Sequence, residues 1–231
     1  MEVGKKYITS NNKHLIISLV CLTLFFVLAI AVSPVSIFNS RSLSEADYSV
    51  FLSVVNSHYQ LFNQFMVYLT LYGREIFWIL VIMLFFILGK KRGKRIAILM
   101  TIVMIVLVPV GVLTKEMVER PRPTIPEDSF LIPADSEYAF PSGHALMVSA
   151  GAAISIALYR NSYKEFVISL LLVTEAGLVC FSRVYVGGHY PLDVFGGILL
   201  GMGISFLFIW KQDKLDLLYR QLSKMIYELR Q

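Results

Sequence analysis

Long stretches without charged side chains most constrain how this chain can fold. A helix that crosses the hydrocarbon core of a bilayer needs about 20 consecutive apolar residues. Five stretches with at most one histidine or charged side chain reach or approach that length: residues 15–40, 96–114, 138–159, 166–182 and 194–210. Charged residues make up only 16% of the chain, below the roughly 25% typical of soluble domains. The sequence therefore predicts an integral membrane protein rather than a soluble, disordered or fibrous one.

A further apolar region follows the first stretch and allows two interpretations. Arg74 and Glu75 interrupt it. Polar side chains are mixed into residues 51–72, so we interpret that segment as a helix at the membrane interface and place the second span over residues 73–89. The alternative is that residues 48–73 cross the membrane themselves, which gives seven spans.

The placement of basic residues favours six spans. With the N-terminus in the cytoplasm, the inner segments hold 15 of the 21 lysine and arginine residues. Those segments are residues 1–14, 90–95, 160–164 and 211–231. This asymmetry satisfies the positive-inside rule at every loop, whereas a seventh span would break it. The net charge of +5 therefore reflects basic residues on the cytoplasmic side, where they fix the topology and attract anionic lipid. It does not indicate nucleic-acid binding.

We therefore expect an all-α bundle of six transmembrane helices in the plasma membrane, with both termini cytoplasmic. The whole chain, residues 1–231, forms one membrane-embedded domain in this interpretation. Residues 211–231 carry leucine and isoleucine at helical spacing among charges, which is typical of an amphipathic helix on the inner membrane surface. A solvated tail helix is the alternative. Cys21 and Cys180 lie within apolar runs and are expected to be buried thiols.

Six basic residues lie on the side that should be poor in positive charge, and topology does not account for four of them: Lys115, Arg120, Arg122 and Arg183. Lys115 ends the third span, and prolines on both sides of Arg122 present it from an extended loop. A cluster of cations at the membrane surface is costly unless it holds an anion, and arginine matches phosphate oxygens with paired donors. The pattern predicts an anion site, and we assign Arg120 a surface role beside it.

A second element, Pro141-Ser142-Gly143-His144, predicts a helix start with Ser142 near the N-cap. Free backbone N–H groups and the helix dipole favour an anion at that point. Gly143 lets the anion approach the backbone closely. His144 then lies within the first turn, near the outer membrane surface.

The third element ends in His189 and Asp193. Pro191 suits the first turn of the sixth span, which places His189 at the mouth of that helix after two glycines. Asp193 follows four residues later and can turn its carboxylate toward one imidazole nitrogen. Such a contact fixes the tautomer and leaves the other nitrogen as a nucleophile.

In this order, Lys-x6-Arg-Pro, Pro-Ser-Gly-His and Ser-Arg-x5-His-x3-Asp resemble the motifs of the type 2 phosphatidic acid phosphatase superfamily. That superfamily includes membrane lipid phosphatases and is similar in its site to the vanadium haloperoxidases. The match runs from Lys115 to Asp193 without a departure. The first hundred residues contribute only their hydropathy to the resemblance.

The resemblance implies a role for each motif residue. His189 would attack phosphorus and form a phosphohistidine, Asp193 would orient His189, and His144 would protonate the leaving oxygen and then activate water. It implies no metal and no other cofactor, because cations neutralise the equatorial oxygens as a metal does elsewhere. The groups implied to hold the phosphoryl oxygens are Lys115, Arg122, Ser142, Gly143 and Arg183.

The expected substrate is a lipid phosphate or diphosphate taken sideways from the outer leaflet, with polyprenyl diphosphate favoured by the resemblance. Phosphatidylglycerophosphate and phosphatidic acid are alternatives, because the motifs recognise phosphate and not the tail. Phosphotransfer to a lipid or sugar acceptor is a second reaction to consider. An anion or lipid transporter is the non-enzymatic hypothesis, although a transporter has no need of the His189–Asp193 pair. Glu175, a carboxylate inside a span, is a functional candidate by default.

Overall fold

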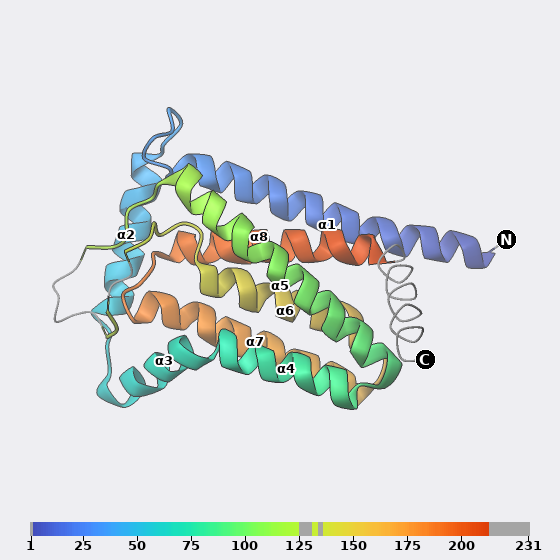
Figure 1. Cartoon of the computed structure of the whole chain (residues 1–231). Helices are drawn as coiled ribbons and strands as arrows, with labels where there is room; N and C mark the ends of the chain where they lie inside the picture. Colours follow the sequence, from blue (N-terminus) through green and yellow to red (C-terminus); the bar gives the residue numbers. More distant parts are fainter. Residues whose placement is uncertain (1, 125–130, 134–135, 213–231) are drawn as a thin grey trace, which may run out of the picture.

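In the computed structural model the described residues are 2–124, 131–133 and 136–212, with side chains described from residue 12 onward. They form helices and connecting turns, and no strand occurs among them. Figure 1 shows most of the helices running along one axis, with α2 lying across one end of the bundle. The helices are α1 (Glu2–Val32), α2 (Arg41–Val55), α3 (Gln60–Tyr72), α4 (Glu75–Leu88), α5 (Lys90–Val118), α6 (Gly143–Leu158), α7 (Tyr163–Tyr185) and α8 (Pro191–Trp210).

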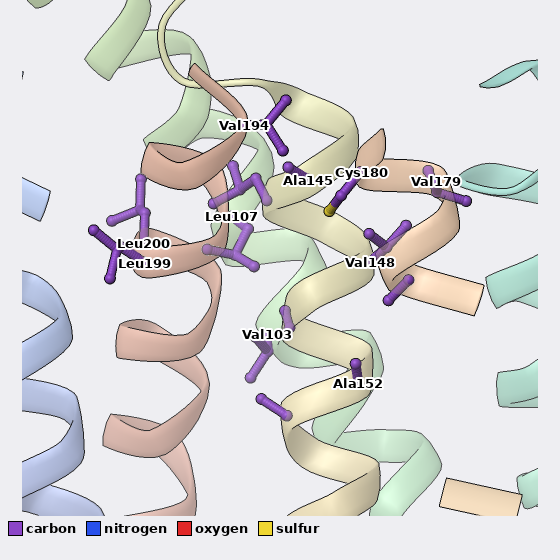
Figure 2. Packing of buried hydrophobic residues seen from close by; sticks show 14 of the residues in the cluster. Val103, Leu107, Ala145, Val148, Ala152, Val179, Cys180, Val194, Leu199 and Leu200 are labelled. Carbon is purple, nitrogen blue, oxygen red and sulfur yellow. The ribbon is translucent and has the colours of Figure 1, made fainter. Parts of the chain in front are cut away.

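Helix α6 is at the centre of the packing. It contacts α5, α7 and α8, while α1 packs on the outer side of α8 and α4 packs on α5. Most of its side chains are small, so neighbouring helices approach it closely from several sides. Figure 2 shows Val148 of α6 with Leu107 of α5 and Leu199 of α8 to one side of it and Val179 of α7 to the other. The core is therefore built around the helix that begins at the second motif.

Two glycines of α8 allow its close approach to α6. A Cβ atom on Gly197 would lie 2.6 Å from the carbonyl oxygen of Ser142, and one on Gly201 would lie 2.4 Å from that of Leu146. Neither position can carry a side chain unless the helices separate. These glycines form the close helix-packing surface that small residues build in membrane bundles. They hold the start of α8 beside the start of α6.

The helices have the length and composition of a multi-pass membrane protein. Among the described residues, α1, α5, α7 and α8 are each long and apolar enough to cross a bilayer. Helices α3 and α4 together make a fifth candidate, bent by 57° at residues 73–74. Helix α6 is apolar but has only 16 residues. The expected all-helical membrane bundle is confirmed. That it has six spans, and that both termini are cytoplasmic, stay predictions.

Two predicted elements differ from the observed helices. The stretch 15–40 is helical only as far as Val32. The single helix predicted over residues 51–72 is wrong, because α2 ends at Val55 and α3 begins at Gln60. The end of α7 explains that break: the Tyr185 carbonyl lies 2.6 Å from His58 Nε2, and its hydroxyl accepts the Tyr59 N–H at 2.9 Å. This break also excludes one continuous helix over residues 48–73. The tail predicted over residues 211–231 lies, from residue 213, outside the described residues.

The glycine packing predicts a difference between two alanine substitutions. Gly201→Ala should lower the free energy of unfolding by about 1–3 kcal/mol, because the new methyl group overpacks the α6–α8 contact. Gly177→Ala is the matched control, since a Cβ atom there meets nothing within 4 Å. Unfolding of the two purified variants in the same detergent measures the difference. Equal stability of the two variants would contradict the packing argument.

Candidate active site

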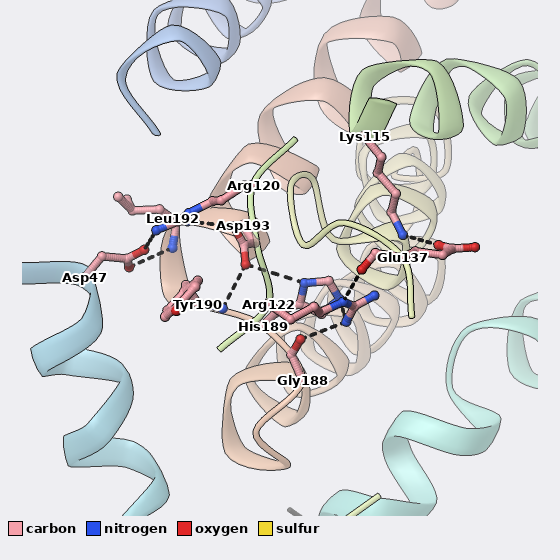
Figure 3. Close-up of polar contacts among 10 residues, drawn as sticks. All are labelled: Asp47, Lys115, Arg120, Arg122, Glu137, Gly188, His189, Tyr190, Leu192 and Asp193. Carbon is pink, nitrogen blue, oxygen red and sulfur yellow. Dashed lines mark hydrogen bonds and ion pairs between the residues drawn. The ribbon is translucent and has the colours of Figure 1, made fainter. Parts of the chain in front are cut away.

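The three motifs meet at the end of the bundle that α2 covers (Figure 1), and Figure 3 shows residues of the first and third motifs there. Lys115 lies in the last turn of α5, and Arg183 lies in the last turn of α7. Helix α6 begins directly after Ser142, and α8 begins at Pro191, two residues after His189. Because α5 and α7 end where α6 and α8 begin, residues far apart in the sequence converge at this end.

His189 is held between a carboxylate and a guanidinium. Its side chain is almost fully buried, and its Nε2 lies 3.1 Å from the Arg122 guanidinium. Arginine can only donate, so Nε2 accepts and presents its lone pair. The ring proton is then on Nδ1, which lies 3.6 Å from Asp193 Oδ2. This tautomer is the one that a nucleophilic Nε2 requires.

Asp193 is oriented by groups other than His189. Its Oδ2 accepts the Tyr190 backbone N–H at 2.9 Å, and its Oδ1 accepts from Arg120 at 2.6 Å. The Arg120 guanidinium also donates to Asp47 Oδ2 at 2.6 Å and stacks over the Tyr190 ring at 4.4 Å from its centroid. The other Asp47 oxygen accepts the Leu192 N–H at 3.0 Å. One cation thus joins α2 to the first turn of α8.

The surface role predicted for Arg120 is wrong. Its side chain is only 5% exposed, because it bridges two buried carboxylates. Burial alone would lower the pKa of Arg120, but the charges on Asp193 and Asp47 outweigh that effect and raise it, so the guanidinium stays protonated. Burial raises the pKa of Asp47 against the opposing hydrogen bond and charge of Arg120. Sequence reasoning missed Asp47 entirely, since its partner lies 73 residues away.

The start of α6 offers donors to an anion. Ser142 is fully buried, and its hydroxyl has no hydrogen-bond partner among the described residues. Its N–H donates to the Asp193 carbonyl at 2.9 Å, which ties the second motif to the third. The helix ladder starts with Leu146 N–H donating to the Ser142 carbonyl, so the N–H groups of residues 143–145 precede it. Such a helix start is an anion-binding arrangement.

His144 faces α3 and the break that follows it. Its Nε2 lies 3.0 Å from the Thr70 carbonyl oxygen, and its Nδ1 lies 3.3 Å from a terminal nitrogen of Arg74. The hydroxyl of the same Thr70 accepts from the buried Arg183 at 3.5 Å. Thr70 therefore lies between His144 of the second motif and Arg183 of the third motif.

The loop before α6 brings two predicted cations together. Lys115 forms an ion pair with the Glu137 carboxylate. Arg122 donates to the backbone oxygens of Glu137 at 2.9 Å and of Gly188 at 2.8 Å (Figure 3). Sequence reasoning also missed Glu137, Arg74 and Thr70, none of which belongs to a motif. Within the described part of the chain, no three His, Cys, Asp or Glu side chains converge where a metal ion could bind.

The intramembrane carboxylate Glu175 packs against the start of α4. Its Oε2 accepts from the Trp78 indole at 3.1 Å, and its Oε1 has no hydrogen-bond partner among the described residues. It lies two helical turns from Arg183 along α7. This hydrogen bond connects α7 to the start of α4.

Loss of the Arg120 cation is expected to destabilise the fold. Arg120→Met leaves two carboxylates buried without their cation, which should lower the free energy of unfolding by about 3–5 kcal/mol. Arg41→Met is the control, because the Arg41 side chain is 91% exposed in a surface pair with Glu45. Denaturant or thermal unfolding in detergent measures both. If the two variants have the same free energy of unfolding, the Arg120 bridge does not stabilise the fold.

Comparisons with known proteins identify the family of this chain. The family model of the PAP2 superfamily matches residues 94–216. The chain is 43% identical over 147 residues to an undecaprenyl-diphosphatase of Sulfolobus acidocaldarius, a match that covers 63% of this chain and 68% of that protein. It is 28% identical over 190 residues to the undecaprenyl-diphosphatase BcrC of Bacillus subtilis, covering 79% and 95% of the two chains.

A solved structure has the same fold. The crystal structure of a transmembrane PAP2 type phosphatidylglycerolphosphate phosphatase from Bacillus subtilis matches with a TM-score of 0.70 at 25% identity. The match covers 85% of this chain and 96% of that one. Sequence motifs, family match and fold agree: the chain belongs to the PAP2 superfamily and is a membrane-embedded phosphatase.

Proposed function

We propose that this phosphatase hydrolyses a polyprenyl diphosphate at the outer face of the membrane, through a phosphohistidine on His189. The observation that carries the proposal is the environment of His189. Its Nε2 presents a lone pair beside the Arg122 cation, and its Nδ1 faces the buried Asp193 carboxylate. A nucleophile in this arrangement needs an electrophilic centre that arrives with negatively charged oxygens, as phosphorus does.

In the first half-reaction His189 Nε2 attacks the terminal phosphorus in line. The N–P bond forms as the bond to the bridging oxygen breaks, and the electron pair stays on that oxygen, which takes a proton from protonated His144. The imidazole becomes positive, and the nearby Asp193 carboxylate stabilises it. The three equatorial oxygens are bound by Lys115, Arg122, Arg183, the Ser142 hydroxyl and the N–H groups at the start of α6.

In the second half-reaction water attacks the phosphohistidine. His144 accepts a proton from that water, the N–P bond breaks, and inorganic phosphate is released with both histidines restored. Charge on the equatorial oxygens is greatest in the two transition states, so fixed cations and N–H donors lower both barriers. Removal of one such donor from the oxyanion hole of a protease costs about 2.7–4 kcal/mol.

The position of the site in the bundle supports an outward orientation. The basic residues 90–95 and Glu165 lie at the other end, where Arg92 donates to Glu165 at 2.8 Å. The positive-inside rule assigns that basic end to the cytoplasm. The end that carries His189 then faces outward. Substrate with its phosphates in the outer headgroup layer would reach it without crossing the bilayer.

The surface of α3 supports a lipid substrate. This helix packs on α7 and supplies the Thr70 carbonyl that contacts His144. Its remaining surface exposes large apolar side chains: Leu61, Phe62, Phe65, Tyr68, Leu71 and Tyr72. An acyl or prenyl tail can lie along this face while its headgroup enters the site. The similarity to two undecaprenyl-diphosphatases favours the prenyl tail, and the structural neighbour makes phosphatidylglycerophosphate the second candidate.

A substrate panel tests the proposed reaction. Purified protein in detergent and EDTA should release phosphate from undecaprenyl diphosphate at a kcat/KM at least about tenfold above that for phosphatidylglycerophosphate, a difference of about 1.4 kcal/mol in transition-state binding. EDTA is included because the mechanism uses no metal, so loss of turnover on chelation would contradict it. A preference for phosphatidylglycerophosphate would transfer the proposal to the second candidate. Transfer of phosphate to an added lipid or sugar acceptor would indicate a phosphotransferase.

The role of His189 is tested by substitution. His189→Ala should reduce phosphate release by at least about a thousandfold while the protein stays folded, because the covalent step loses its nucleophile. His14→Ala is the matched control, since His14 stacks on Phe206 at 5.8 Å, remote from the motifs. Labelled substrate should leave an acid-labile phosphoryl group on the wild-type protein and none on His189→Ala. Turnover retained in His189→Ala would exclude the phosphohistidine, and so would equal activity in both variants.

A further inference from the structure

Arg74 reaches the active site although it belongs to none of the three motifs. It lies at the break between α3 and α4, where the chain bends by 57°. One of its terminal nitrogens lies 3.3 Å from His144 Nδ1. The same nitrogen would lie 3.5 Å from a Cβ atom on Gly143, so it also approaches the start of α6. A cation from a different part of the chain thus borders the phosphate-binding helix start.

The hydrogen bonds of His144 show which side of the ring Arg74 occupies. The Thr70 carbonyl can only accept, so His144 Nε2 carries the proton and Nδ1 presents its lone pair toward Arg74. Nδ1 is therefore the nitrogen through which His144 can exchange a proton with substrate. In the proposed function the protonated form of His144 carries its second proton on Nδ1 and gives it to the leaving oxygen, which places Arg74 on the leaving-group side.

Arg122 lies on the other side of the reacting phosphorus, next to the nucleophile. Its guanidinium lies 3.1 Å from the nucleophilic Nε2 of His189. The two arginines therefore lie beside the two different imidazoles, one at the attacking nitrogen and one at the proton donor. A phosphoryl group between the imidazoles would have Arg122 near its attacked face and Arg74 near its departing oxygen.

The chemistry of the leaving group identifies what Arg74 would bind. When a diphosphate is cleaved, the departing fragment is a lipid monophosphate, which carries charged non-bridging oxygens next to the departing oxygen. When a monophosphate ester is cleaved, the departing fragment is an alcohol and has no such charge. The planar guanidinium matches phosphate oxygens with paired donors. Arg74 therefore has a partner in a diphosphate that a monophosphate lacks.

Resting on the proposed function, we infer that Arg74 binds the lipid-linked phosphate of a diphosphate substrate and gives the enzyme its preference for diphosphates over monophosphates. Its neighbour Glu75 pairs with Nε and one terminal nitrogen of Arg74. The other terminal nitrogen is directed at His144 before substrate arrives. The Arg74 side chain is 33% exposed, so a lipid headgroup can reach it from the membrane surface.

The inference is tested with two substrates that share one prenyl tail, a diphosphate and a monophosphate. Arg74→Gln should lower kcat/KM for the diphosphate by about 10- to 100-fold and for the monophosphate by at most about threefold, since one charged hydrogen-bonded contact is lost only with the first. Arg74→Lys keeps the charge without the paired donors and should fall between. Arg41→Gln is the control, because that arginine is exposed on α2. Equal losses on both substrates would make Arg74 a positioning residue for His144 and overturn the inference, as would no loss on either.

A binding measurement separates this inference from the proposed function. Methylenediphosphonate and inorganic phosphate are titrated calorimetrically into wild-type protein and Arg74→Gln. Wild-type protein should bind methylenediphosphonate more tightly than phosphate, and the substitution should remove that difference. If the difference persists in Arg74→Gln, the second-phosphate site is excluded even when the enzyme hydrolyses polyprenyl diphosphate. If the substitution removes it but no lipid diphosphate is hydrolysed, the site stands and the proposed substrate is wrong.

Discussion

The Arg120 guanidinium lies between Asp193 and Asp47, 2.6 Å from an oxygen of each. Asp193 is completely buried, and an ionised carboxylate in that position costs several kcal/mol of desolvation unless a cation and hydrogen bonds compensate it. Arg120 supplies the cation and the Tyr190 N–H supplies the second bond. With both carboxylate oxygens fixed, the Asp193 oxygen that faces His189 has a defined position. The orientation of the nucleophile therefore depends on a residue that does not touch it.

The same bridge explains why α2 belongs to the site. Asp47 receives Arg120 on one oxygen and the Leu192 N–H on the other. That N–H lies in the first turn of α8, where helix donors have no partner within the helix. These contacts fix α2 across the end of the bundle, where it shields the buried charges from water. The arginines of the site then divide into two groups. Arg120 is committed to two carboxylates, whereas Arg122 lies beside His189 and Arg183 contacts Thr70, which also contacts His144.

The sequence predicted the parts of this molecule that are encoded locally. Uncharged stretches predict membrane helices, Pro191 predicts the start of α8, and the His189–Asp193 spacing predicts a carboxylate that faces the His189 ring. The role of Arg120 could not be predicted, because its two partners lie 73 residues away on either side. The break at residues 56–59 was missed for the same reason, since Tyr185 supplies its hydrogen bonds. Pairings between distant segments depend on packing, which no local pattern records.

The bend between α3 and α4 shows how a local signal and distant packing combine. Gly73 is required there, because a Cβ atom would lie 2.4 Å from Val179 on α7. The bend interrupts the helix ladder inside an apolar region, where unsatisfied backbone groups are costly. His144 donates a hydrogen bond to the Thr70 carbonyl, and the Ser182 hydroxyl pairs with the Thr70 hydroxyl at 2.8 Å. A straight helix through this segment would need neither contact and would not carry Arg74 to His144. The polar groups that make the bend tolerable are thus the ones that connect it to the active site.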